Sequence, residues 1–179
     1  MAEPITLEEA KAHIRVTADD EDDLITALIV AAREWVENFT ALVLVEREVT
    51  ETFDSFDCLR LSGWPIAPDA TLVIDYLDGA GVTQPADDWW LQAYRRPARV
   101  TSAIGTTWPT PYSGAGTVMV TYTAGYASAE DVPQALKQAM LLLIGHWYGR
   151  RESVVVGATV AEVPLAVSSL VRPYCESVL

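Results

Sequence analysis

Residues 124–152, AGYASAEDVPQALKQAMLLLIGHWYGRRE, decide the fold of this 179-residue chain. They predict one long helix, because Asp131 can accept hydrogen bonds from free amides at a helix start and Pro133 fits a first helical turn. Apolar residues then recur with the 3.6-residue period of a helix and form one stripe. The stripe consists of Leu136, Ala139, Met140, Leu143, Ile144 and Trp147.

This helix is apolar beyond a single stripe. Leu141 and Tyr148 fall on the opposite side, among polar residues, and Leu142 lies near the edge of that side. A helix with apolar residues on more than one side usually buries both sides. The pattern therefore indicates either a helix at the centre of a larger core or a helix whose second face packs against another subunit.

Two helices are expected before it. Thr6 and Glu9 have the spacing of a capping box, which predicts a short helix ending near Val16. The second helix opens with an acidic run and extends to about Thr40. Its main apolar stripe is expected to be Leu24, Ala27, Leu28, Ala31, Trp35 and Phe39, and the stripe is widened by Ile25, Ile29, Ala32 and Val36.

The acidic run consists of Asp19, Asp20, Glu21, Asp22 and Asp23. It lacks the central glycine of a calcium loop and leads directly into a helix, so a solvated helix start is the preferred interpretation. Residues 1–57 hold fifteen acidic and four basic residues, and the whole chain has a formal net charge of −13. Such a surface repels phosphate backbones and disfavours nucleic-acid binding.

From Leu42 the period changes to two, which is typical of strands. Asp78, Gly79, Ala80 and Gly81 predict a hairpin turn. The expected strands are residues 43–53, 58–61, 71–77, 82–84, 89–94, 99–102 and 117–123. Together these patterns predict an α+β fold. A core of about four helices (residues 1–41 and 129–179) carries a small antiparallel β module (residues 42–128) between its second and third helices.

After the long helix, residues 153–163 have no helical period and predict a loop or an extended arm. Residues 164–172 predict a short last helix that Pro173 ends. No apolar run approaches the roughly 18–20 residues of a membrane span, and the first residues have no signal-peptide pattern. We therefore expect no membrane association and a cytosolic location during folding.

The chain offers no strong catalytic or cofactor motif. Cys58 and Cys175 fit no metal or redox spacing, and His13 and His146 have no metal-binding context. We expect no enzymatic activity, no metal and no cofactor. Trp89 and Trp90, with the other rings of the β module, leave open a small carbohydrate-binding module as an alternative, although such rings also fill thin cores.

Several groups of residues, in this order over nearly the whole chain, resemble the head–tail connector (adaptor) proteins of tailed phages and of related gene-transfer particles. They are residues 5–16 with the acidic start that follows, residues 31–33, 36–37 and 40, residues 64–66 and 75–79, residues 122–126, 132–133, 136, 138–139 and 147–152, and residues 163–164 and 170–174.

The resemblance implies a structural virion protein at the head–tail junction, made in the host cytoplasm. Such proteins form a ring, usually of twelve copies, that docks under the portal protein. The ring extends the DNA channel without binding DNA specifically, and it offers an attachment surface to the stopper or tail-completion protein.

Three groups of residues acquire expected roles from this resemblance. The subunit interface is expected at Leu141, Leu142, Tyr148, Ile25 and Ile29. An arm that engages the portal or a neighbouring copy is expected at Val154, Val155, Val156, Leu165, Leu170 and Tyr174. An acidic channel surface is expected at Asp19, Asp20, Glu21, Asp22 and Asp23.

Overall fold

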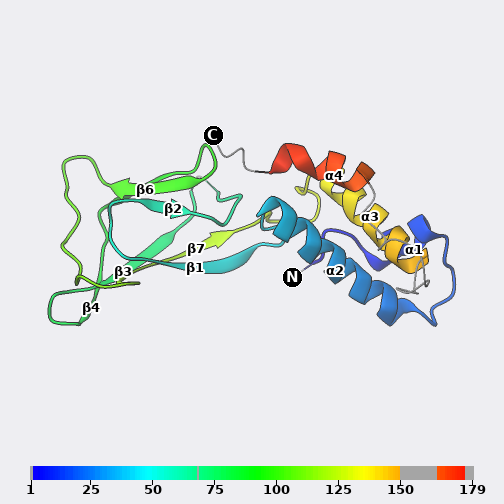
Figure 1. Cartoon of the computed structure of the whole chain (residues 1–179), viewed down its shortest axis with the longest axis horizontal. Coiled ribbons are helices and arrows are strands. Elements are labelled where there is room, and N and C mark those ends of the chain that lie inside the picture. The colour runs from blue at the N-terminus through cyan, green and yellow to red at the C-terminus, as the bar shows by residue number, and fades with distance from the viewer. Residues whose placement is uncertain (1, 68, 150–164, 176–179) are drawn as a thin grey trace, which may run out of the picture. The chain divides into compact units, whose positions relative to one another are not determined.

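The computed structural model describes residues 2–67, 69–149 and 165–175 (Figure 1). These residues form four α-helices, one 3-10 helix and seven β-strands, and the strands lie between the second and third helices in the chain. The predicted α+β class is confirmed. The chain divides into two compact units, a helical unit (Met1–Val45 with Tyr126–Leu179) and a β unit (Glu46–Gly125).

The helical unit begins with α1 (Leu7–Ile14) and α2 (Asp22–Thr40). The predicted capping box is present: the Glu9 N–H donates to the Thr6 hydroxyl at 3.1 Å, and the Thr6 N–H donates to the Glu9 carboxylate at 2.8 Å. Each helix ends at a residue in the left-handed region, Arg15 and Ala41, with φ values of 59° and 51°. Such a residue stops the helical hydrogen-bond ladder and turns the chain.

α3 (Gln134–Gly149) is the long helix predicted from residues 124–152, but its start differs from the prediction. The Asp131 carboxylate accepts hydrogen bonds from the N–H and the hydroxyl of Ser128, so it stabilises the preceding turn. The Pro133 carbonyl accepts from the N–H groups of Leu136 and Lys137, so Pro133 is the N-cap residue, one position before the first helical residue, Gln134.

α3 contacts α1, α2 and α4 (Leu165–Val171), which the 3-10 helix η1 (Arg172–Tyr174) extends past the expected stop. Its predicted stripe is buried except for Trp147, which is half-buried; Leu136, Met140, Leu143 and Ile144 are at 0% exposure. Residues 43 and 44, predicted as the start of a strand, are buried but lie outside the strands. The Leu44 N–H instead donates to the Glu37 carboxylate at 2.7 Å.

The β unit contains two antiparallel sheets. The strands are β1 (Arg47–Phe53), β2 (Leu59–Leu61), β3 (Leu72–Leu77), β4 (Thr83–Pro85), β5 (Trp89–Gln92), β6 (Ala98–Ser102) and β7 (Val118–Ala124). One sheet has the order β1-β7-β3-β4 and the other β2-β6-β5. The side chains of β7 alternate as a half-buried strand requires, with Val118, Val120 and Tyr122 buried.

Two polar groups fix loops of this unit. The Asp78 carboxylate accepts from the N–H groups of Ala80 and Val82 at 2.9 and 3.0 Å, which closes the predicted hairpin turn. The Tyr122 hydroxyl, inside the unit, donates to Glu51 and accepts from the Gly63 N–H at 2.9 Å. This second network holds the segment after β2 on the four-stranded sheet.

Candidate functional site

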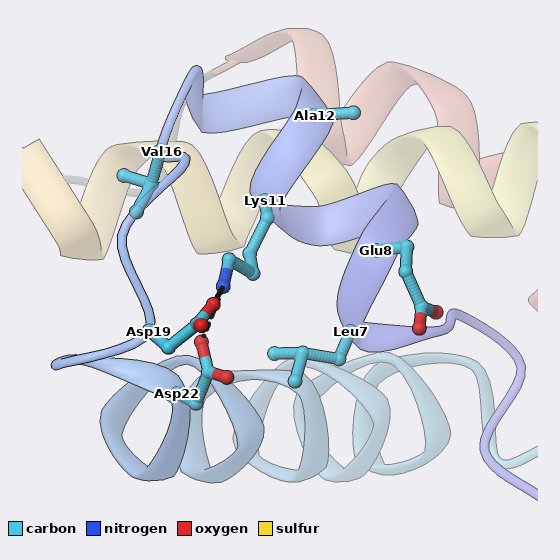
Figure 2. A pocket seen from close by; sticks show the side chains of 7 residues that line it. All are labelled: Leu7, Glu8, Lys11, Ala12, Val16, Asp19 and Asp22. Atoms are coloured by element: carbon cyan, nitrogen blue, oxygen red, sulfur yellow. Dashed lines mark hydrogen bonds and ion pairs between the residues drawn. The ribbon is translucent and has the colours of Figure 1, made fainter.

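The acidic run borders a groove of about 400 Å³ between α1 and α2 (Figure 2). Lys11 points from α1 toward the run, and its ammonium donates to Asp19 and Asp22, each at 2.7 Å. Only 14% of the Lys11 side chain is exposed. These hydrogen bonds raise the pKa of Lys11 above its ordinary value, and the bond to Asp19 contributes most. In turn, the Lys11 ammonium lowers the pKa of Asp19.

The run therefore does not form a uniform acidic surface. Asp19 and Asp22 share the Lys11 charge, and Glu21 accepts a hydrogen bond from the Tyr148 hydroxyl of α3. Asp20 and Asp23 are exposed. The predicted acidic surface did not distinguish the five carboxylates, because residues 11, 19 and 22 come into contact only when α1 and α2 pack together.

On α3, the residues expected at a subunit interface are half-buried within the chain. Leu141, Leu142 and Tyr148 have intermediate exposure, and the helix contacts three other helices. Tyr148 also joins the end of α3 to the start of α2 through Glu21. A polar substitution of Tyr148 would therefore disturb the fold as well as any interface, while a role of Leu141 and Leu142 in assembly stays a prediction.

On α2, the expectation for Ile25 and Ile29 is wrong for this conformation. Their side chains are 0% and 3% exposed, since they pack in the core of the helical unit. Ile25, Ile29, Ala32 and Val36, which were expected only to widen the apolar stripe of α2, are the residues that are buried.

The set expected to be the main stripe lies outside this core. We call it the outer flank of α2, defined as Leu24, Ala27, Leu28, Ala31, Trp35 and Phe39. Leu24 and Phe39 are 40% and 46% exposed, and Ala27 and Ala31 are also exposed. Leu28 and Trp35 are half-buried, and the Trp35 and Phe39 rings stack with centroids 5.0 Å apart.

The described part of the expected arm packs onto the helical unit. In α4, Val167 and Val171 are buried, and α4 contacts α3. Leu165 is 84% exposed, while Leu170 and Tyr174 are half-buried. Val154, Val155 and Val156 lie outside the described residues.

The aromatic residues of the β unit differ in how far they are buried. Phe56 stacks on Trp108 with centroids 4.5 Å apart and meets Tyr76 edge-on, so part of the set fills the interior. Trp90 is 52% exposed and Trp89 is half-buried. Consecutive strand residues point to opposite faces, so these two rings do not form one stacking platform.

Among the described residues, no group of three or more His, Cys, Asp or Glu side chains is placed to hold a metal ion. Within the same residues, no helix has the length and apolar character needed to cross a membrane. The features that stand out are thus surfaces and packed helices.

Residues 4–57, which include α1, α2 and β1, match the model of a family described as "Phage gp6-like head-tail connector protein". No curated protein sequence matches the chain.

Solved structures match over nearly the whole length. A chain in the neck of an empty gene transfer agent (GTA) particle, computed with C6 symmetry, has 27% identity and a TM-score of 0.77, with 100% of this chain and 94% of that chain covered. A chain of a native GTA virion has 26% identity and a TM-score of 0.74, with 98% and 91% covered. A chain in the neck of a native GTA particle, computed with C12 symmetry, has 27% identity and a TM-score of 0.72, with 94% and 89% covered.

Proposed function

We propose that this chain, whose resemblance to head–tail connector proteins the family match and the solved structures confirm, is a structural subunit of a connector ring in the neck of a tailed phage or GTA particle. The observation that carries the proposal is the likeness to a neck chain over both units, with 100% of this chain and 94% of that chain covered. The C6 and C12 symmetries of two of the matched assemblies support a ring of identical copies.

The ring would dock under the portal protein, extend the DNA channel and offer an attachment surface to a stopper or tail-completion protein. A direct test mixes the purified chain with isolated portal rings of the same particle and examines the product by electron microscopy. We expect stoichiometric addition of the chain as a ring. Portal rings that stay bare at saturating concentrations of a folded chain would contradict the proposal.

A channel that lets DNA slide must avoid tight phosphate contacts. The net charge of −13 supports this property, with Asp20 and Asp23 as exposed carboxylates of the acidic run. Asp19 and Asp22 add less to the repulsion because Lys11 lies between them. We expect no binding of duplex DNA in fluorescence-anisotropy titrations at physiological salt, and micromolar binding would rule out this role of the surface.

The segment near α4 would engage the portal or a neighbouring copy. Removing everything after Arg151 is a poor test, because Val167 and Val171 are part of the helical core and the truncated chain would lose them. A sharper variant replaces Val154, Val155 and Val156 with serine and keeps α4. We expect unchanged thermal unfolding and weaker addition to portal rings, whereas full addition would exclude these valines as anchors.

The carbohydrate-binding alternative rests on exposed aromatic rings alone. A glycan array tests it with the intact chain and with Trp90→Ala, since Trp90 is the more exposed of the adjacent pair. Binding that Trp90→Ala abolishes would favour this alternative over a purely structural role.

A further inference from the structure

The outer flank of α2 is an apolar surface that the described residues of the helical unit cover only in part, at Leu28 and Trp35. Its six residues follow one side of the 19-residue helix from its first turn to its last. None of them carries a charge, in a chain with a formal net charge of −13. Exposed leucine and phenylalanine side chains on one helix face can supply the apolar part of a protein–protein contact.

The charge of the chain limits which surfaces can meet between identical copies. Two chains that each carry −13 repel one another, and at physiological salt this repulsion is screened only beyond about 8 Å. Close contact between copies is therefore favoured where both surfaces are uncharged. The six flank residues meet this condition, and the exposed Glu34 lies at the edge of the flank, three residues from Ala31. Arg33 and Glu37 lie on another side of α2 and are engaged in ion pairs within the chain.

We propose that the outer flank of α2 is the surface through which one copy of this chain packs against the next copy in the ring. The inference rests on the proposed function and adds the contact surface to it. In a cyclic ring the contact is heterologous, so the flank meets a different surface on its neighbour. The buried residues Ile25 and Ile29 support the flank from beneath and do not touch the neighbour.

The area of the flank determines whether two isolated copies can form a stable contact through it. A 19-residue helix is about 28 Å long and about 10 Å wide, so one side covers about 280 Å², against about 800 Å² per partner in a stable complex. The flank alone is too small for a stable dimer. At micromolar concentration and physiological salt, isolated copies are therefore expected to be monomeric, and the contact forms when the portal gathers the copies into a ring. Weak self-association of isolated copies is expected only at millimolar concentration with the charges screened.

A photo-crosslinking experiment tests the occupant of the flank. Benzoylphenylalanine is placed at Ala31, an exposed flank residue, or at Thr26, an exposed residue on a different side of the same helix. Each full-length variant is assembled with portal rings and irradiated. We expect a crosslink between two copies of the chain from position 31 and none from position 26. A crosslink from position 31 only to the portal or to another protein, or no crosslink, would overturn the inference while leaving the proposed function intact.

A second pair of variants keeps the inference testable if the chain does not add to portal rings, the result that would sink the proposed function. Sedimentation equilibrium at about 1 M salt measures self-association with charge repulsion screened. We expect Ala31→Glu to weaken association at least about tenfold and Thr26→Glu to leave it unchanged, since only the first buries an unpaired charge in an apolar contact. Equal effects of the two variants, or no self-association of the unchanged chain at millimolar concentration, would overturn the inference.

Discussion

Replacing Tyr122 with phenylalanine removes one hydroxyl from the interior of the β unit and keeps the ring. Tyr122 is 2% exposed, and its hydroxyl donates to Glu51 and accepts from the Gly63 N–H at 2.9 Å. Losing a hydrogen bond to a charged group costs about 1.5–3 kcal/mol, and losing a neutral one about 0.5–1.5 kcal/mol. Glu51 keeps a bond from the Ser62 N–H at 2.9 Å and lies 3.4 Å from the Gly63 nitrogen, which offsets part of the loss. We therefore expect a net loss of about 2–3 kcal/mol.

Native-state hydrogen exchange of the full chain, followed by mass spectrometry on peptides from β7, reports the stability of the β unit by itself. The matched control is Tyr112→Phe, the same chemical change at a side chain that is 52% exposed, where we expect a change within about 0.5 kcal/mol. A loss below about 0.5 kcal/mol for Tyr122→Phe would refute the assignment of this network as a stabilising element.

The same site allows a double-mutant cycle. A Cβ at Gly63 would lie 2.7 Å from the Tyr122 hydroxyl oxygen, while its next contacts are 3.2 Å and 3.3 Å away. Removing the hydroxyl relieves the closest contact, so Gly63→Ala should cost less in the Tyr122→Phe background than alone. Additive costs, within about 0.5 kcal/mol, would show that the close approach of Gly63 to the hydroxyl is not the constraint.

Three further predictions concern stability. Glu37→Ala should cost about 2–3 kcal/mol in urea unfolding, because it removes the acceptor of a backbone N–H and the partner of a half-buried arginine, while Glu34→Ala, with a 61% exposed side chain, should change little. Leu143→Ala, at a fully buried position, should lower the free energy of unfolding by about 2–5 kcal/mol, and the 84% exposed Leu165→Ala should leave it nearly unchanged; equal effects would contradict the packing. Burial raises the pKa of Tyr122 above its ordinary value of 10.0, so the unfolded chain loses this proton first. The stabilisation is thus complete below about pH 10 and falls above it by up to about 1.4 kcal/mol per pH unit, and Tyr122→Phe should show a shallower decline in denaturant titrations.

The strands were predictable to within a few residues because a half-buried strand carries its pattern locally. In β7 the alternation of valine and tyrosine with threonine is the alternation of buried and outward positions. The predicted start of the first strand at Val43 was wrong for a tertiary reason. Residues 42–44 are apolar because they are buried, and the Leu44 N–H is satisfied by the Glu37 side chain of α2 instead of by a neighbouring strand.

The assembly surfaces were predictable only in part. The period of α2 revealed an apolar arc wider than one core needs, but two adjacent stripes satisfied that period. In the structure, the stripe with Ile25 and Ile29 is buried, and the stripe with Leu24 and Phe39 lies outside the core. In the acidic run, likewise, nothing in the spacing indicates that Lys11 pairs with Asp19 and Asp22 and offsets one of their two charges.

The sequence by itself determined the elements of this protein, since capping boxes, turn residues and hydrophobic periods act over a few residues. It also determined the acidic charge and the width of the apolar arcs on α2 and α3. Only the tertiary structure decided which part of each arc is buried, because that choice depends on which helices pack together. α3 contacts three helices and keeps its extra apolar residues half-buried, whereas the described residues cover one apolar side of α2 only in part. Hydrophobic periodicity shows which residues are apolar and share a helix face. The packing of the helices determines whether that face is buried within the chain or is available to another chain.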